Sequence, residues 1–161
     1  MGLIRLQSSS LPSGSVLQRK IGTFNSLVNL TSTSFVDTGV SALSITRTKN
    51  DSIIHAKLMG GRWRLDSGTA PAGFLTSFYV SENSGSYTTL GTGADAPEFW
   101  YFGTTDNLQG AHSAHDFYTP ASNVTTIDVK IYAAILSNSV KWSTGDTNGA
   151  TMVFEVTEIA A

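Results

Sequence analysis

Hydrophobic and polar residues alternate with a period of two along much of this chain. The clearest run extends from Val124 to Leu136, where one set of alternate positions is apolar throughout. The other set carries mostly hydroxyl, charged and aromatic side chains. This period predicts a strand with one buried face, and the length of the run predicts a central place in a sheet. The residues that we expect to face the core are Ile127, Val129, Ile131, Ala133 and Ile135.

Two further segments have the same period. From Thr151 to Ile159 the alternate residues Met152, Phe154 and Val156 share one face, and the run from Gly73 to Val80 has a similar apolar face. Shorter or less regular runs predict weaker strands. These runs are Val16–Leu30, Val40–Arg47, Ser52–Met59, Trp63–Leu65, Tyr87–Leu90 and Phe99–Phe102.

Clusters of Gly, Asn, Asp and Ser separate these segments, for example at Asp37–Gly39 and Asn83–Gly85. Such residues favour turns because they accept unusual backbone angles or hydrogen-bond their own backbone. No segment has helical periodicity. Many short strands with frequent turns predict an all-β fold, an antiparallel β-sandwich that is jelly-roll-like. The length of 161 residues suits one domain, which we assign to residues 16–161.

Residues 1–15 differ from the rest and are assigned to a short extended N-terminal arm. Leu3, Ile4 and Leu6 are apolar, and Ser8–Ser10 with Pro12–Gly14 is typical of a flexible connector. Two interpretations remain open. The arm docks on a neighbouring subunit through its apolar residues, or it is a frayed terminus.

Residues 91–123 interrupt the alternation. A long irregular segment in a compact domain is often an interaction loop. The alternative is that its aromatic residues cap one end of the core. The residues that we single out as a possible interaction loop are Phe99, Trp100, Tyr101, Phe102, His112 and His115.

Charged residues are scarce, and their scarcity limits the classes of function. They make up 14% of the chain, against about 25% in an average protein. The net charge is −2, so no basic field exists to attract nucleic acid. The chain has no cysteine, and no apolar run has the length of a membrane span. The polar surface is supplied by 21 Ser and 20 Thr, and such a weakly charged surface indicates contact with other protein.

One short motif resembles a catalytic signature. Phe35-Val36-Asp37-Thr38-Gly39 has the Asp-Thr-Gly of aspartic proteases, whose chemistry requires two carboxylates that share a proton. Asp146-Thr147-Asn148 does not repeat the motif. We interpret Asp37–Gly39 as a turn in which Asp hydrogen-bonds its own backbone and Gly accepts a positive φ.

The remaining candidates for chemistry are also incomplete. His112 and His115 would face a common ion on a helix, with His55 or Asp116 as further ligands, but a solvated loop suits them better. No Gly-x-Ser-x-Gly elbow positions a serine nucleophile, and no paired carboxylates indicate a depolymerase. We therefore expect no enzyme activity, no cofactor and no resident metal. Aromatic residues that could stack on sugars, Trp63, Trp100, Trp142 and the five tyrosines, are more often core residues.

Three phrases, in order along the chain, carry a resemblance to a known family. They are Gly14–Gln18, then Thr31–Val40 followed by Leu43–Thr46, and finally Thr151–Ala161. Together they resemble a domain of tailed bacteriophages, especially marine ones. Arg19 and Lys20 depart from the apolar, β-branched continuation that the resemblance leads us to expect after Gln18.

The resemblance implies a jelly-roll-like virion domain, often trimeric, found in head decoration proteins and at tail-fibre tips. We expect a capsid decoration protein on the head exterior, assembled in the host cytoplasm into the virion. Its partners would be the major capsid protein or another virion protein, with self-association as a homotrimer, and neither nucleic acid nor a membrane. The arm residues Leu3, Ile4 and Leu6 would anchor it to the capsid. The alternative is a tail-fibre or tail-tip domain that recognises host surface glycans.

Overall fold

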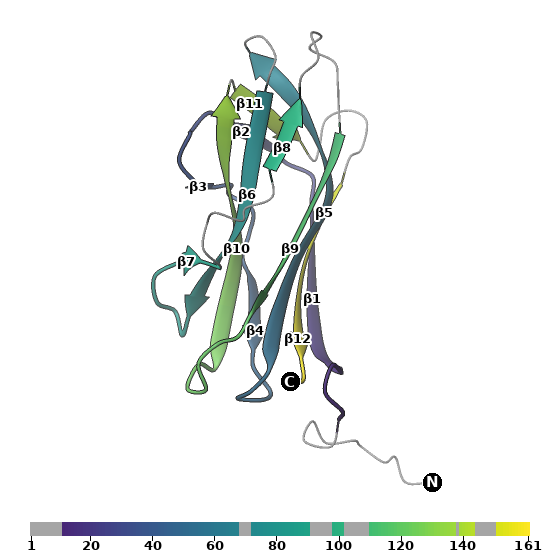
Figure 1. Cartoon of the computed structure of the whole chain (residues 1–161), viewed down its shortest axis with the longest axis vertical. Coiled ribbons are helices and arrows are strands. Elements are labelled where there is room, and N and C mark those ends of the chain that lie inside the picture. Colours follow the sequence, from purple (N-terminus) through teal and green to yellow (C-terminus); the bar gives the residue numbers. More distant parts are fainter. Residues whose placement is uncertain (1–10, 68–71, 91–97, 102–109, 138, 144–150) are drawn as a thin grey trace, which may run out of the picture.

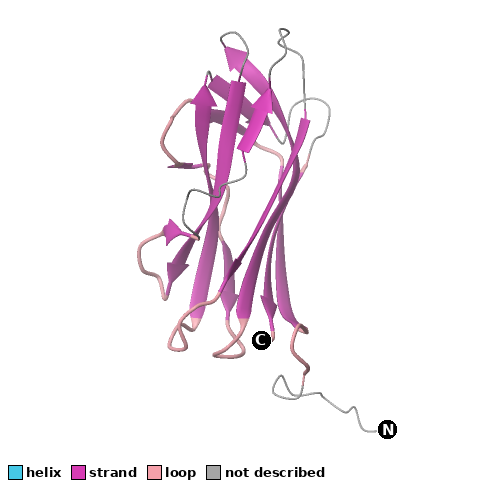
Figure 2. Ribbon diagram, viewed as in Figure 1, coloured by secondary structure: helices cyan, strands magenta, loops and turns pink. Residues whose placement is uncertain are grey.

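A computed structural model describes residues 11–67, 72–90, 98–101, 110–137, 139–143 and 151–161. These residues form twelve strands, and the part of the chain that they cover contains no helix (Figures 1 and 2). The strands are β1 (Val16–Phe24), β2 (Leu27–Leu30), β3 (Val36–Asp37), β4 (Leu43–Thr46), β5 (Ile53–Ser67), β6 (Ala72–Glu82), β7 (Thr88–Thr89), β8 (Glu98–Tyr101), β9 (Gly110–Tyr118), β10 (Thr126–Ser137), β11 (Ser139–Ser143) and β12 (Met152–Ile159).

The strands form two antiparallel sheets. Sheet A contains β1, β12, β5, β11 and β2 in that order, with β9 also paired to β5. Sheet B contains β3, β10, β6 and β7, with β4 also paired to β10 and β8 to β6. In Figure 1, β1, β12, β5 and β9 lie to the right, and β10, β6 and β7 lie to the left. The expected all-β sandwich is confirmed.

The order of pairing identifies the sandwich as a jelly roll. The first strand pairs with the last, β1 with β12, and the pairing continues inward as β4 with β10, β5 with β9 and β6 with β7. The chain is therefore equivalent to one long hairpin whose paired arms are rolled into two sheets, as in jelly rolls. The first and last strands lie side by side, and the backbone N–H of Gly14 donates to the carbonyl of Ala160 at 2.7 Å.

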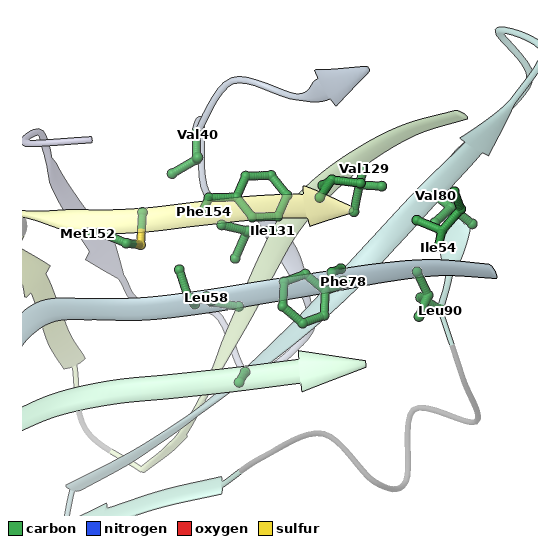
Figure 3. Packing of buried hydrophobic residues seen from close by; sticks show 14 of the residues in the cluster. Val40, Ile54, Leu58, Phe78, Val80, Leu90, Val129, Ile131, Met152 and Phe154 are labelled. Atoms are coloured by element: carbon green, nitrogen blue, oxygen red, sulfur yellow. The ribbon is translucent and has the colours of Figure 1, made fainter. Parts of the chain in front are cut away.

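The core lies between the inner faces of the two sheets. β10 contributes Ile127, Val129, Ile131, Ala133 and Ile135, which are all buried, as their alternation predicts. Met152, Phe154 and Val156 of β12 face them from the other sheet. Figure 3 shows Phe154 of β12 and Phe78 of β6 within this layer, and their rings stack with centroids 6.0 Å apart.

Strand β5 is longer than expected, because it joins two of the runs that the sequence pattern separates. Gly60 and Gly61 stand between these runs with φ of 80° and 71°, where the register with β9 shifts between Gly60 and Arg62. A Cβ on Gly60 would lie 2.7 Å from the carbonyl oxygen of Thr151, so only glycine fits there. The bulge lets a single strand pair with β12, β9 and β11.

The first weak run is divided into β1 and β2. The register of β1 against β12 shifts between Val16 and Gln18, immediately before the unexpected pair Arg19 and Lys20. The main error concerns residues 91–123. Gly110–Tyr118 is strand β9 in sheet A, so the expectation of one long irregular segment was wrong there. The short strand expected at Phe99–Phe102 is present as β8, which spans Glu98–Tyr101 in sheet B.

We predict that Phe154→Ala destabilises the fold by about 3–5 kcal/mol, because the ring is fully buried between the sheets. Urea unfolding followed by circular dichroism measures this change. The matched control is Phe117→Ala, since Phe117 is 56% exposed, and its cost should stay below about 1 kcal/mol. Equal losses for the two variants would contradict the assigned core.

Candidate interaction surfaces

Most of the exposed large hydrophobic side chains that the structure describes lie on the outer face of sheet A. Among the side chains that the structure describes, five large hydrophobic ones are exposed, and four of them belong to this sheet. They are Val16, Ile21, Leu27 and Phe117, with exposures of 59%, 51%, 46% and 56%. They alternate along their strands with inward-facing residues. Single exposed hydrophobics are ordinary, but several on the same face of one sheet suit an interaction surface.

The charges of this face are arranged across neighbouring strands. Arg19 of β1 forms an ion pair of 2.7 Å with Glu155 of β12. Glu155 stands directly opposite Lys57 of β5 in the β12–β5 register. The face therefore has both signs of charge at its centre, with apolar and polar side chains around them.

Two imidazoles and an aromatic ring cover the β5–β9 side of this face. His55 stacks on Phe117 with ring centroids 4.4 Å apart and planes 11° from parallel. His115 meets the ring of His55 edge-on at 5.8 Å. Burial lowers the pKa of His55, with further lowering by His115 and Lys57 and an opposing effect of Glu155 and Asp116. Neutral His55 therefore extends the apolar surface at neutral pH.

The outer face of sheet B carries an aromatic group of a different kind, which we call the tyrosine patch. It consists of Phe35, Tyr79, Tyr87 and Tyr132, which are all half-buried. The rings of Tyr79 and Tyr132 stack with centroids 3.8 Å apart, and the rings of Phe35 and Tyr87 adjoin them at 6.3 Å and 6.5 Å. Burial raises the pKa of Tyr79 and of Tyr87, so both phenols stay protonated and able to donate.

A charged pair borders the tyrosine patch. The Nζ of Lys130 donates to Asp37 Oδ2 at 2.6 Å and lies 5.1 Å from the ring centroid of Tyr87. Asp37 also accepts a hydrogen bond of 2.9 Å from the N–H of Gly39, whose φ is 75°. The interpretation of Asp37–Gly39 as a turn is therefore confirmed, and Asp37 is engaged as the partner of Lys130.

A buried carboxylate lies at the end of the sandwich where the chain terminus Ala161 is found. Glu158 is fully buried and accepts hydrogen bonds from the side chain of Gln18, the backbone N–H groups of Thr48 and Lys49, and the hydroxyl of Thr48. Desolvation alone would raise the pKa of Glu158, but these hydrogen bonds outweigh it and hold the pKa below its usual range. All of these partners belong to the chain itself, so this cluster fixes the β4–β5 connection.

His112 is a second buried polar group, and it joins the two sheets. Its Nε2 lies 2.7 Å from Thr76 Oγ1, so β9 of sheet A is hydrogen-bonded to β6 of sheet B. The ring also packs against Phe74, with centroids 5.0 Å apart. Burial lowers the pKa of His112 to about 4, and the imidazole is neutral at physiological pH.

The structure separates the residues that we grouped as one interaction loop. Phe99, Trp100 and Tyr101 lie in β8, opposite Phe74, Gly73 and Ala72 of β6. His112 is buried and His115 is exposed, because they lie on opposite faces of β9. They cannot bind one ion together. Phe102 and the arm residues Leu3, Ile4 and Leu6 lie outside the described residues.

Sequence reasoning missed the residues that make the outer face of sheet A. Ile21 and Phe117 were not recognised, since Ile21 follows two charged residues and Phe117 stands in a segment without clear alternation. The signal that could have found Phe117 was a weak period of two in Ala111–Tyr118, where Ala114 and His112 face inward. Within the described ranges, no group of three or more His, Cys, Asp or Glu residues could hold a metal ion, and no helix could span a membrane.

No family model matches this sequence, and no curated protein matches it. Among solved structures, it is similar to a mutant VP2 protein of infectious bursal disease virus in derived T=1 particles. The TM-score is 0.41 at 9% identity, over 99% of this chain and 44% of that one. The Gx strain of the same virus gives 0.39 at 7% identity, over 91% and 38%.

The CBM22-1 xylan-binding domain from Paenibacillus barcinonensis Xyn10C gives a TM-score of 0.34 at 13% identity, over 94% of this chain and 99% of that one. The chain spans less than half of the VP2 chains that it matches. All of these TM-scores are low.

We predict that acid weakens the fold through His112. Its folded pKa of about 4 lies below the ordinary value of 6.5, so in this window the unfolded chain binds a proton that the folded protein does not. The stabilisation that comes from the neutral imidazole is fully present above pH 6.5, the ordinary pKa of histidine. It is lost as the pH falls toward about 4, the pKa in the folded protein, by up to ~3 kcal/mol. Urea unfolding at a series of pH values measures the slope.

The control variant for the acid response is His112→Gln, whose side chain retains hydrogen-bonding atoms but does not titrate. Its absolute stability will be lower, yet its loss of stability between about pH 6.5 and about pH 4 should be clearly smaller than that of the native protein. Identical slopes for the two proteins would show that the buried imidazole does not control the acid response.

Proposed function

We propose that this chain is a non-enzymatic bacteriophage virion structural protein, a decoration protein of the head exterior. The observation that carries the proposal is the set of exposed hydrophobic side chains on the outer face of sheet A, where Ile21 and Phe117 are more than half exposed. A surface of this kind suits attachment to other protein more than it suits chemistry. The ordered resemblance of Gly14–Gln18, Thr31–Val40 and Thr151–Ala161 to virion domains of tailed phages supports the same function.

Such a protein would act by binding, with many copies on one particle. Each copy would contact the major capsid protein through Leu3, Ile4 and Leu6 of the arm and would contact its neighbours through the sandwich. Contacts that are individually weak become effective when a lattice presents many of them at fixed spacing. The low charge of the chain, 14% of residues, favours such protein–protein contacts.

The first measurement is the copy number of this protein relative to the major capsid protein in purified virions. We expect hundreds of copies per particle, of the same order as the capsid subunits they would bridge. Deletion of residues 1–12 should abolish binding to capsids, while circular dichroism and thermal unfolding stay unchanged because the strands begin at Val16. Absence from virions would refute the proposal, and capsid binding by the shortened chain would refute the anchor.

The second candidate function is a tail-fibre or tail-tip domain that recognises host surface glycans. The observation that favours it is the tyrosine patch, because sugars stack on aromatic faces, and Lys130 and Asp37 beside it offer hydrogen-bond donors and acceptors. This candidate implies a few dozen copies or fewer in each virion.

A glycan array with the full chain tests this candidate. If the patch binds sugar, Tyr87→Ala should lose most of the signal, since the Tyr87 ring lies at the edge of the patch against Lys130. Phe117→Ala on the other sheet is the control and should bind as the native chain does. The absence of binding to any glycan, or equal binding by both variants, would rule out the tyrosine patch as a sugar site.

A further inference from the structure

The outward side chains of β1, β12, β5 and β9 form rows that run across the strands, because paired residues of neighbouring strands stand side by side. From β1 to β9, these rows are Arg19, Thr157, His55, Phe117; then Ile21, Glu155, Lys57, His115; then Thr23, Val153, Met59, Ser113. A shorter row contains Val16, Ile159 and Ile53. We call this surface the four-strand face.

We propose that the four-strand face packs against the same face of a second copy of the chain, about a two-fold axis that lies between β12 and β5 and runs parallel to them. This operation places β12 over the partner's β5 and β1 over the partner's β9. Each row then faces the same row of the partner, with the order of the strands reversed. The inference concerns the same face of sheet A as the proposed virion function, but it does not depend on that function.

The charges of the face are complementary under this operation. Glu155 meets the partner's Lys57, and Lys57 meets the partner's Glu155, so two ion pairs form about the axis. Arg19, whose side chain is 52% exposed, meets the partner's Phe117, and a guanidinium over an exposed aromatic ring is a favourable contact. The ion pair of Arg19 with Glu155 within each copy is retained.

The apolar residues are matched in the same way. Val153 meets the partner's Met59, and Ile159 meets the partner's Ile53. Ile21, which is 51% exposed, meets the partner's His115. Val153, Met59, Ile159 and Ile53 therefore each meet an apolar side chain of the partner.

The charge pattern also selects the direction of the axis. An axis across the strands through the second row would place Glu155 over the partner's Glu155 and Lys57 over the partner's Lys57. Like charges in contact are unfavourable, and such repulsion excludes wrong arrangements more than it stabilises the right one. Of these two axes, the one parallel to the strands brings opposite charges together.

The size of the face places this contact among the smaller protein–protein interfaces. Four strands at ~4.8 Å spacing and about eight residues of ~3.3 Å each give about 500 Å² per copy. Standard stable interfaces bury about 800 Å² per partner, so this contact is at the lower limit of specific association. We expect a reversible dimer with a dissociation constant on the order of 10 μM, which becomes significant where copies are concentrated.

Sedimentation velocity of the full chain over a range of concentrations tests the proposal. We expect a reversible monomer–dimer equilibrium that Phe117→Ala weakens by about tenfold, through loss of the contact with Arg19. The matched control is Val36→Ala, since Val36 is an exposed hydrophobic residue of sheet B, and it should dimerise as the native chain does. A monomer at every concentration up to about 1 mM, or a trimer without a dimer, would overturn the proposal.

Charge exchange gives a sharper test of the axis. Glu155→Lys and Lys57→Glu should each be monomeric, because each homodimer would contain like charges at both central contacts. An equimolar mixture of the two variants should form a heterodimer in which both contacts again join opposite charges. Circular dichroism and thermal unfolding verify that each variant is folded. If folded variants dimerise singly as strongly as the native chain, or if their mixture stays monomeric, the proposed axis is wrong.

Discussion

The contact between Phe154 of β12 and Phe78 of β6 joins the two sheets at the centre of the sandwich, and the other features of the molecule depend on it. Each sheet has one apolar face, and neither is stable in water until the other covers it. With the two rings stacked between the sheets, the strands on both sides are held at a fixed spacing. Because alternate residues point to opposite sides of a strand, burial of one set determines which side chains form the outer faces.

The packing of the two sheets restricts the protonation state and the hydrogen bonding of the polar groups inside the sandwich. Glu158 and His112 are both removed from water, and burial of an uncompensated charge would cost more than the fold could sustain. They meet this constraint in different ways. Glu158 keeps its charge, because donors from β1 and the β4–β5 connection surround the carboxylate. His112 loses its charge and hydrogen-bonds Thr76, so it joins the sheets without an ionic cost.

The two outer faces differ in their side chains. The aromatic rings on sheet B suit stacking on a sugar, and the exposed hydrophobic and charged residues on sheet A suit contact with protein. The side chains in and beside the tyrosine patch already have partners within the chain, since Tyr79 stacks on Tyr132 and Lys130 pairs with Asp37. The four-strand face has exposed apolar side chains and a central alternation of charge that no other element of the described chain covers. An interaction surface on sheet A therefore requires no rearrangement of the fold.

The sequence alone determined the class of the fold, because period two in β6, β10 and β12 reflects burial on one side of a strand and needs no knowledge of the partner. It also determined the turn at Asp37–Gly39, which is set by local hydrogen bonding and backbone angles. Tertiary structure decided the rest. The nested pairing of a jelly roll joins residues more than a hundred positions apart, and the identity of β9 as a strand depends on β5. The four-strand face exists because Ile21, Lys57 and Phe117, which have no distinctive sequence context, are brought together by three registers that no local pattern specifies.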